Sequence, residues 1–130
     1  MKKVNVVAAV IEDNGEILCV QRGSNKLEYI SEKFEFPGGK IEEGETLEMT
    51  IIREIQEELK MKIVPIEQLP TVEHTYSDFH LTMHVFRCSC ESRMLELTEH
   101  ISFSWLTKEE LRSLDWAAAD IPIVDYLLAI

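Results

Sequence analysis

The sequence GKIEEGETLEMTIIREIQEELKM, residues 39–61, contains the clearest helix pattern in the chain. We expect a helix from about Thr46 to Leu59, because apolar side chains recur there at the spacing of one helical face. The residues on that face are Glu48, Ile51, Ile52, Ile55 and Leu59. All but the first are apolar, so the pattern predicts that this stripe packs against a sheet.

Three glutamates, Glu54, Glu57 and Glu58, stand at i, i+3 and i+4 of the same helix. Carboxylates at this spacing repel one another and resist ionising together. A hard divalent cation removes the conflict, and Mg²⁺ prefers oxygen ligands and readily bridges to phosphate oxygens. The alternative is an ordinary solvated acidic face, and the three glutamates taken alone favour that alternative.

The residues around the three glutamates favour a site. Gly38 and Gly39 allow the backbone to approach a metal or a phosphate closely. Glu45 stands just before the helix, and Arg53 within it carries a rigid fork of donors that could hold a carboxylate in place.

These residues resemble the signature of the Nudix hydrolase family. The family pattern is Gly, five residues, Glu, seven residues, Arg-Glu, an aliphatic residue, any residue, Glu-Glu, any residue, Gly and an aliphatic residue. The chain has Gly39, then Glu45, then the run from Arg53 to Met61, and it departs from the pattern at Lys60 alone. Because the family glycine ends the helix in a left-handed conformation, a lysine there costs about 1 kcal/mol or makes the helix run on.

The resemblance extends along most of the chain. Residues 34–40, FEFPGGK, and residues 116–122, WAAADIP, look like the MutT-like and CTP pyrophosphohydrolase branch. The resemblance implies an α/β fold with a mixed β-sheet sandwiched between helices, in a single domain over residues 1–130. It also implies metal ligation by Gly38 or Gly39 through a carbonyl and by Glu54, Glu57, Glu58 and Glu99. The implied cofactor is Mg²⁺, with Mn²⁺ as the alternative.

Strand patterns surround this helix. We expect strands at Lys3–Ile11, Ile17–Val20, Phe34–Phe36, Ile63–Val72, Leu81–Cys90 and Ile101–Leu106. Asn14-Gly15 indicates a tight hairpin turn, and Pro37-Gly38-Gly39 indicates a break. Thr107 to Glu110 matches a capping box. A last helix opens at Asp120, and we expect Ile121, Val124 and Leu128 on its buried face.

Composition excludes several classes of protein. The net charge of −11 argues against wrapping a nucleic-acid backbone, which needs a basic surface. No apolar run approaches the roughly 20 residues that cross a bilayer. The three cysteines lack a partner pair at zinc spacing, which indicates reduced thiols and a cytoplasmic protein. We therefore expect a protein that binds neither nucleic acid nor membrane. The resemblance adds a small-molecule nucleotide as its ligand, and we expect a monomer or homodimer.

The resemblance implies hydrolysis of a nucleoside triphosphate to a monophosphate and pyrophosphate, with Arg53 and Glu45 among the catalytic group. The general base is Glu54 or Glu99. Arg22 and Lys40 are candidate phosphate contacts, against the alternative of ordinary surface charge. Phe79 and Asp120 are candidate base contacts.

Base recognition leaves two interpretations of Asp120 open. An ionised aspartate only accepts hydrogen bonds, which favours cytosine or an 8-oxo-purine with an N–H. Alternatively, Asp120 N-caps the last helix. We interpret all four histidines as structural or surface residues.

Three functions are compatible with the sequence. The first is a triphosphate pyrophosphohydrolase, with 8-oxo-dGTP or (d)CTP and its modified forms as substrate. The second is hydrolysis of another nucleoside diphosphate linked to a second group, such as a nucleotide sugar or a dinucleoside polyphosphate. The third is a non-catalytic nucleotide-binding module, which the intact glutamates disfavour. A calcium-binding face is the most remote alternative, because no EF-hand spacing is present.

Overall fold

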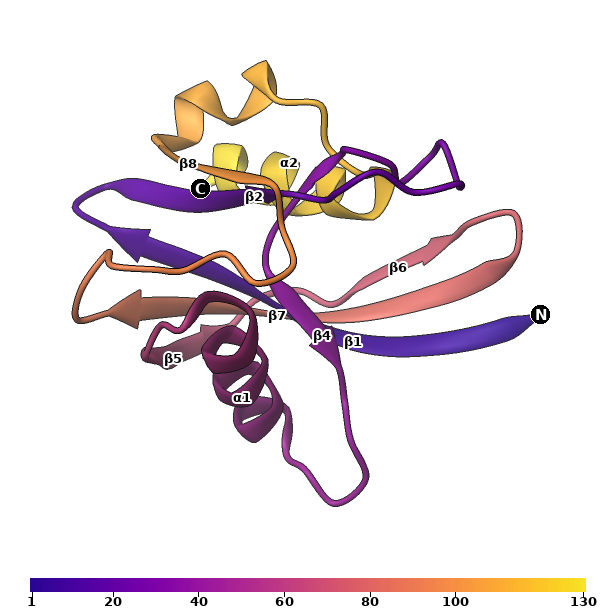
Figure 1. Ribbon diagram of the computed structural model, residues 1–130, viewed down its shortest axis with the longest axis horizontal. Helices are drawn as coiled ribbons and strands as arrows, with labels where there is room; N and C mark the ends of the chain where they lie inside the picture. Colours follow the sequence, from indigo (N-terminus) through magenta and orange to yellow (C-terminus); the bar gives the residue numbers. More distant parts are fainter.

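The computed structural model describes residues 1–130, and every element of the fold lies within one mixed α/β arrangement (Figure 1). The elements in chain order are β1 (Lys2–Asp13), β2 (Glu16–Gln21), β3 (Phe34–Glu35), β4 (Gly38–Lys40), α1 (Leu47–Leu59), β5 (Ile63–Gln68), β6 (Val72–Thr75), β7 (Phe79–Cys90), β8 (Ser102–Leu106), the 3₁₀ helices η1 (Lys108–Ser113) and η2 (Ala118–Asp120), and α2 (Ile121–Ala129).

Strand β1 is the centre of the sheet. It pairs in parallel with β7 from Lys2↔Phe79 to Ile11↔Cys88, and β4 pairs antiparallel with its other edge. Strands β5 and β6 both pair antiparallel with β7. The end of β1 turns into β2, which in turn pairs with β3 and β8. The sheet is therefore mixed, and β4 brings the two glycines beside β1.

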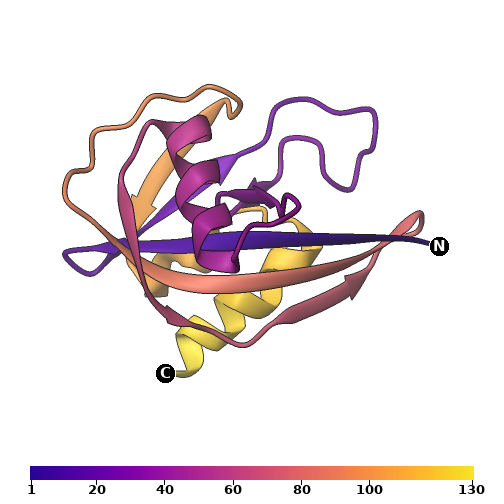
Figure 2. The same ribbon diagram turned by 90° about the horizontal axis from the view of Figure 1, so that it is seen from below.

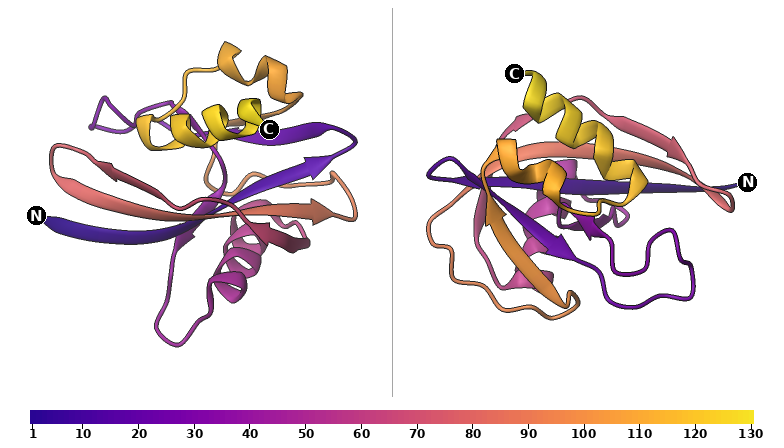
Figure 3. Two further views of the ribbon diagram at one scale, coloured as in Figure 1. Left: turned by 180° about the vertical axis from the view of Figure 1, so that it is seen from behind. Right: turned by 90° about the horizontal axis from the view of Figure 1, so that it is seen from above.

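Two helical layers cover opposite faces of the central strands, with α1 on one side and α2 on the other (Figures 1 and 2). Because successive strand residues point to opposite faces, β1 supplies both cores. Val7, Ala9 and Ile11 pack in the core under α1. Ala8 and Val10 pack in the core under α2, which lies over the sheet in the right-hand view of Figure 3. Strand β1 is therefore buried on both faces between two helical layers, which confirms the expected α/β sandwich.

Helix α1 has the predicted extent, since Thr46 is its N-cap and accepts a hydrogen bond from the Met49 amide at 3.1 Å. The predicted stripe is wrong at two positions, because Glu48 and Ile52 are both exposed. Ile52 is 44% exposed, whereas Glu58 is buried beside Ile51 and Ile55. The helix is therefore rotated so that a carboxylate occupies the edge of its packed face.

Lys60 takes the left-handed conformation of the family glycine, with φ of 56°, and its amide bonds the Gln56 carbonyl. The helix therefore stops where the signature requires, and the lysine accepts the backbone strain.

Three other predictions need correction. Pro37-Gly38-Gly39 is more than a break, because Gly38–Lys40 forms β4. The strand expected at Ile63–Val72 is divided into β5 and β6, with Pro70, which has no amide proton, between them. In α2, Ile121 is exposed and the fully packed residues are Ile123, Val124 and Leu127.

The hairpin at Asn14-Gly15 and the capping box at Thr107 are confirmed. Both turn residues have positive φ, and the Thr107 amide and hydroxyl each donate to Glu110 at 3.0 Å. All three cysteines are free thiols. None of the helices has the length and apolar character required to span a bilayer.

Candidate active site

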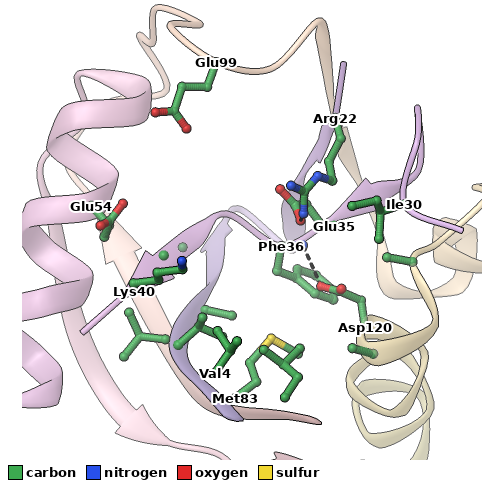
Figure 4. Close-up of a pocket in the computed structure, with 18 of the residues that line it drawn as sticks. Val4, Arg22, Ile30, Glu35, Phe36, Lys40, Glu54, Met83, Glu99 and Asp120 are labelled. Carbon is green, nitrogen blue, oxygen red and sulfur yellow. Dashed lines mark hydrogen bonds and ion pairs between the residues drawn. The ribbon is translucent and has the colours of Figure 1, made fainter. Parts of the chain in front are cut away.

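A cavity of about 700 Å³ lies between α1 and the segment that leads into α2. Most of the site residues predicted from the sequence line it: Arg22, Gly38, Gly39, Lys40, Glu54, Glu58, Phe79, Glu99 and Asp120. Figure 4 shows Glu54 and Glu99 on one side of the cavity and Phe36 with Asp120 on the other. Glu45, Arg53 and Glu57 do not line it, so they act on it from behind or from its rim.

Arg53 organises the acidic side of the cavity. Its guanidinium contacts Glu45 in a bidentate pair, with Nε to Oε2 at 2.7 Å and Nη2 to Oε1 at 2.9 Å. Nη1 donates to Glu54 at 3.0 Å and to Glu57 at 3.3 Å, and Nη2 reaches the Lys40 carbonyl at 3.2 Å. Hydrogen bonding from Arg53 lowers the pKa of Glu45 to about 2. One side chain thereby ties the start of α1, its middle and β4 together, whereas the sequence predicted only that Arg53 could hold a carboxylate.

The three helix glutamates differ in environment. The side chain of Glu57 is 60% exposed at the rim. Burial raises the pKa of Glu54, and Arg53 partly offsets that effect. Glu58 is 6% exposed, and burial together with the adjacent Glu99 carboxyl raises its pKa to about 9. Glu58 is therefore the carboxylate that most needs a compensating charge.

The two glycines of β4 are required by close contacts. A Cβ on Gly39 would come within 2.3 Å of the Glu54 carboxyl, and one on Gly38 would meet the Val7 carbonyl oxygen at 1.9 Å. Only glycine allows β4 to pass between β1 and the carboxylates. The Gly-Gly pair therefore places bare backbone against the acidic wall, as the sequence suggested.

The donor set fits a hard cation. Glu58 Oε2 is buried without a hydrogen-bond donor, and Glu54 and Glu99 add oxygen ligands from the same wall. No group of three or more acidic, histidine or cysteine side chains is placed to hold a metal ion by itself. Mg²⁺ does not need a complete set of protein ligands, because it keeps several waters and is commonly held by one or two carboxylates and substrate phosphates.

Asp120 does not cap α2, which corrects one of the two interpretations from the sequence. Its side chain makes no capping bond, and Oδ1 instead accepts the Phe36 amide at 3.0 Å. Asp120 is 5% exposed, and burial, reinforced by the nearby charge of Glu35, raises its pKa well above the usual range. The raised pKa favours the protonated form, which can donate as well as accept, over the ionised acceptor that we expected.

Aromatic rings complete this end of the cavity. Phe79 lies 5.0 Å from the ring of Tyr76, and Phe36 stacks on Trp116 at 4.7 Å. Phe79 also lines the cavity, so it remains available to a planar ligand. Phe34 is partly buried and packs edge-on against Trp116, beside the core.

Two residues of the cavity wall were missed. Glu35 accepts from Arg22 Nη1 at 3.3 Å and bonds His100 Nε2 at 2.9 Å. The side chain of His100 is 4% exposed and lines the cavity. The sequence carried weak signals, since Glu35 interrupts two aromatics just before the glycine pair and His100 directly follows Glu99.

A mixed sheet between helices, with a Gly-Gly strand against a carboxylate-bearing helix, defines the Nudix class of proteins. The chain belongs to the NUDIX domain family, whose pattern matches residues 6–126. It is similar to the CTP pyrophosphohydrolase of Escherichia coli K12, with 31% identity over all of this chain and 95% of that protein.

It is also similar to the 8-oxo-dGTP diphosphatase of the same strain, with 36% identity over 64% of each chain. Among solved structures, the MutT protein from Methanosarcina mazei Go1 superposes with a TM-score of 0.86 at 25% identity, over 97% of this chain and 93% of that one.

Proposed function

We propose that this protein is a Mg²⁺-dependent nucleoside triphosphate pyrophosphohydrolase, which converts an NTP or dNTP to the monophosphate and pyrophosphate. The proposal rests on one cavity that has Glu54, Glu58, Glu99 and the bare Gly39 backbone at one end. Its other end offers the buried carboxyl of Asp120, whose pKa is raised, beside aromatic rings. The two ends suit a polyphosphate and a base, respectively.

The site residues have different roles in this proposal. Glu54, Glu57, Glu58, Glu99 and the Gly38 or Gly39 carbonyl would hold the metal ions. Mg²⁺, when bound, neutralises phosphate charge and lowers the pKa of a bound water. Arg53 fixes Glu54 and Glu57, so their carboxylates need not reorganise during the reaction.

Water attacks the β-phosphorus, and the bond from that phosphorus to the α,β-bridging oxygen breaks. Glu54 or Glu99 accepts the proton of the water, and the bridging oxygen leaves with the monophosphate. Arg22 and Lys40, which both line the cavity, are the cations of this chain that can contact the phosphates.

We propose (d)CTP and 8-oxo-dGTP as the two substrates to compare. The similarity to a CTP pyrophosphohydrolase extends over the whole chain, and that to an 8-oxo-dGTP diphosphatase over part of it. A protonated Asp120 can donate to one edge atom of a base and accept from another, so it is compatible with either base.

The test is pyrophosphate release with Mg²⁺ over a panel of CTP, dCTP, dGTP, 8-oxo-dGTP, ADP-ribose and a dinucleoside tetraphosphate. We expect monophosphate and pyrophosphate in equal amounts from a triphosphate, with the label from H₂¹⁸O in the pyrophosphate. Activity on ADP-ribose or the dinucleotide alone would contradict the proposal, as would label in the monophosphate. Glu48→Gln, an exposed glutamate of the same helix, is the matched control for loss of charge.

A further inference from the structure

The segment Glu91–Ile101 joins β7 to β8 without regular secondary structure, and it carries Glu99 to the cavity. We call it the strap. It follows the edge of the molecule past the C-terminal end of α1 (Figure 2). Its apolar residues Leu95 and Leu97 pack against the core beneath α1. A segment that presents a reactive carboxylate needs its position fixed by something other than a strand or a helix.

The strap supplies the missing hydrogen bonds at the end of α1. The last carbonyls of a helix have no partner within it. The Glu96 amide donates to the Leu59 carbonyl at 2.9 Å, and the Thr98 amide donates to the Glu58 carbonyl at 3.1 Å. The Thr98 hydroxyl lies 3.1 Å from the Glu57 carbonyl and 3.0 Å from that of Glu58, so its one proton is shared between them. Thr98 thus bonds the backbone of two of the proposed metal-binding residues.

The residues that follow Glu99 are held on the opposite side. His100 Nε2 bonds Glu35 at 2.9 Å, and the Ile101 amide donates to the Gln21 carbonyl at 3.0 Å. Glu99 therefore stands between an anchor on α1 and an anchor on β2 and β3. The first anchor sets the position of Glu99 relative to Glu58, because the carboxyls of Glu99 and Glu58 are in contact.

We propose that Thr98 is a positioning residue for Glu99. Its hydroxyl locks the strap to the last turn of α1 and thereby fixes the distance from the Glu99 carboxyl to Glu58. The inference rests on the proposed function, because Glu99 must take part in hydrolysis for its position to matter. Misplacing a catalytic group by about 1 Å costs on the order of 10²-fold in rate.

The experiment compares Thr98→Val, which keeps the shape and removes the hydroxyl, with Thr98→Ser, which keeps the hydroxyl. We expect Thr98→Val to lower kcat about 10-fold or more with KM changed less than about 2-fold, and Thr98→Ser to restore kcat to within about 2-fold. Thr107→Val is the matched control, because Thr107 also bonds locally but lies in the capping box of η1. Equal loss in the serine and valine variants would overturn the proposal.

A double-mutant cycle separates positioning of Glu99 from a general effect on the helix. If Thr98 acts through Glu99, adding Thr98→Val to Glu99→Gln lowers kcat no further. If the two losses multiply, Thr98 acts independently of Glu99 and the proposal fails. Thr98→Ala, assayed well below its melting temperature, serves the same cycle if the valine variant does not fold.

The parent and the Glu99→Gln variant distinguish the two levels of failure. A parent protein that hydrolyses no nucleotide refutes the proposed function itself. An active parent with a fully active Glu99→Gln variant leaves the proposed function standing and overturns the role of Thr98.

Discussion

Two carboxyl groups are buried in this small protein, one on each side of the central strands. Glu58 on α1 is 6% exposed, and Asp120 before α2 is 5% exposed. Burial is the main cause of a raised pKa in both. They differ in their partners, since Asp120 Oδ1 has the Phe36 amide whereas Glu58 Oε2 has no donor at all. Two carboxyls buried to a similar extent can therefore have different roles.

The two carboxyls also differ in the second cause of the raised pKa. For Glu58 it is the carboxyl of Glu99, a second potential ligand in direct contact. For Asp120 it is the more remote charge of Glu35, which Arg22 and His100 already partner. Under the proposed function a bound cation would relieve the repulsion at Glu58, whereas protonation relieves it at Asp120. The cavity accordingly has a charged end and a neutral hydrogen-bonding end.

Replacing Glu58 by glutamine should have the largest effect on activity. It tests the comparison at the charged end of the cavity, where Glu58 lies. We expect kcat to fall about 10³-fold or more, because a ligand is lost where charge develops. Without metal the variant should be more stable than the parent at pH 7, by about 1–3 kcal/mol, since it no longer carries a buried ionisable group. Enzyme assays and urea denaturation in EDTA measure the two changes.

Metal addition provides the control for this variant. Mg²⁺ should raise the melting temperature of the parent and of Asp120→Asn, but much less that of Glu58→Gln. If Glu58→Gln retains the parental rate, or if it is less stable without metal, Glu58 is a structural residue and the comparison fails.

The next effect concerns Arg53, which holds the charged end together. Lysine keeps the charge but loses the fork that bonds Glu45 bidentately and reaches Glu54. We expect Arg53→Lys to lower kcat about 10- to 100-fold. The half-saturating Mg²⁺ concentration should rise. A steady-state titration with Mg²⁺ measures both, and Arg112→Lys, in an exposed pair with Asp125, is the matched control.

The residues at the charged end of the cavity were easier to predict from the sequence than those at the neutral end. Apart from Gly38 and Glu99, the charged end lies within 23 consecutive residues, and helical periodicity alone places Glu54, Glu57 and Glu58 together. Its details depend on packing, because the rotation of α1 that buries Glu58 and exposes Ile52 is set by contacts with the sheet.

The neutral end comes from distant parts of the chain. Asp120 meets Phe36 across 84 positions, and Glu35 meets His100 across 65. No local period encodes such contacts. The capping interpretation of Asp120 followed from its place before Pro122, and it was wrong because the Phe36 amide takes the side chain instead. Division of the Ile63–Val72 strand likewise depends on pairing of both parts with β7.

Substitutions of Asp120 test whether the neutral end of the cavity recognises the base. If the carboxyl acts in its protonated form, Asp120→Asn keeps a donor and an acceptor and should retain kcat/KM within about 10-fold, whereas Asp120→Ala should lose about 10²-fold on the preferred base. Rates on (d)CTP and 8-oxo-dGTP, measured side by side, test this. Equal losses on every base in both variants would show that Asp120 does not read the base.

The pH dependence of stability tests the raised pKa of Asp120 directly. An acid whose pKa is higher in the folded state contributes fully below its unfolded pKa, and that contribution is lost as pH rises toward the folded pKa. Asp120→Asn does not titrate. Its stability relative to the parent should therefore increase steadily from about pH 4 to neutrality, since the unfolded pKa is near 3.8. A difference that does not change with pH, measured by urea denaturation, would show that Asp120 is ionised in the fold.

The smallest effect is expected at Lys60, which ends α1 in a left-handed conformation with φ of 56°. Lys60→Gly should stabilise the protein by about 0.5–1 kcal/mol, because glycine adopts this conformation without the Cβ penalty. The side chain lies outside the cavity, so kcat should be unchanged. Lys62→Gly, at a position without positive φ, is the control and should not be stabilising. A stabilised but equally active Lys60→Gly would show that the signature glycine serves the end of the helix rather than the reaction.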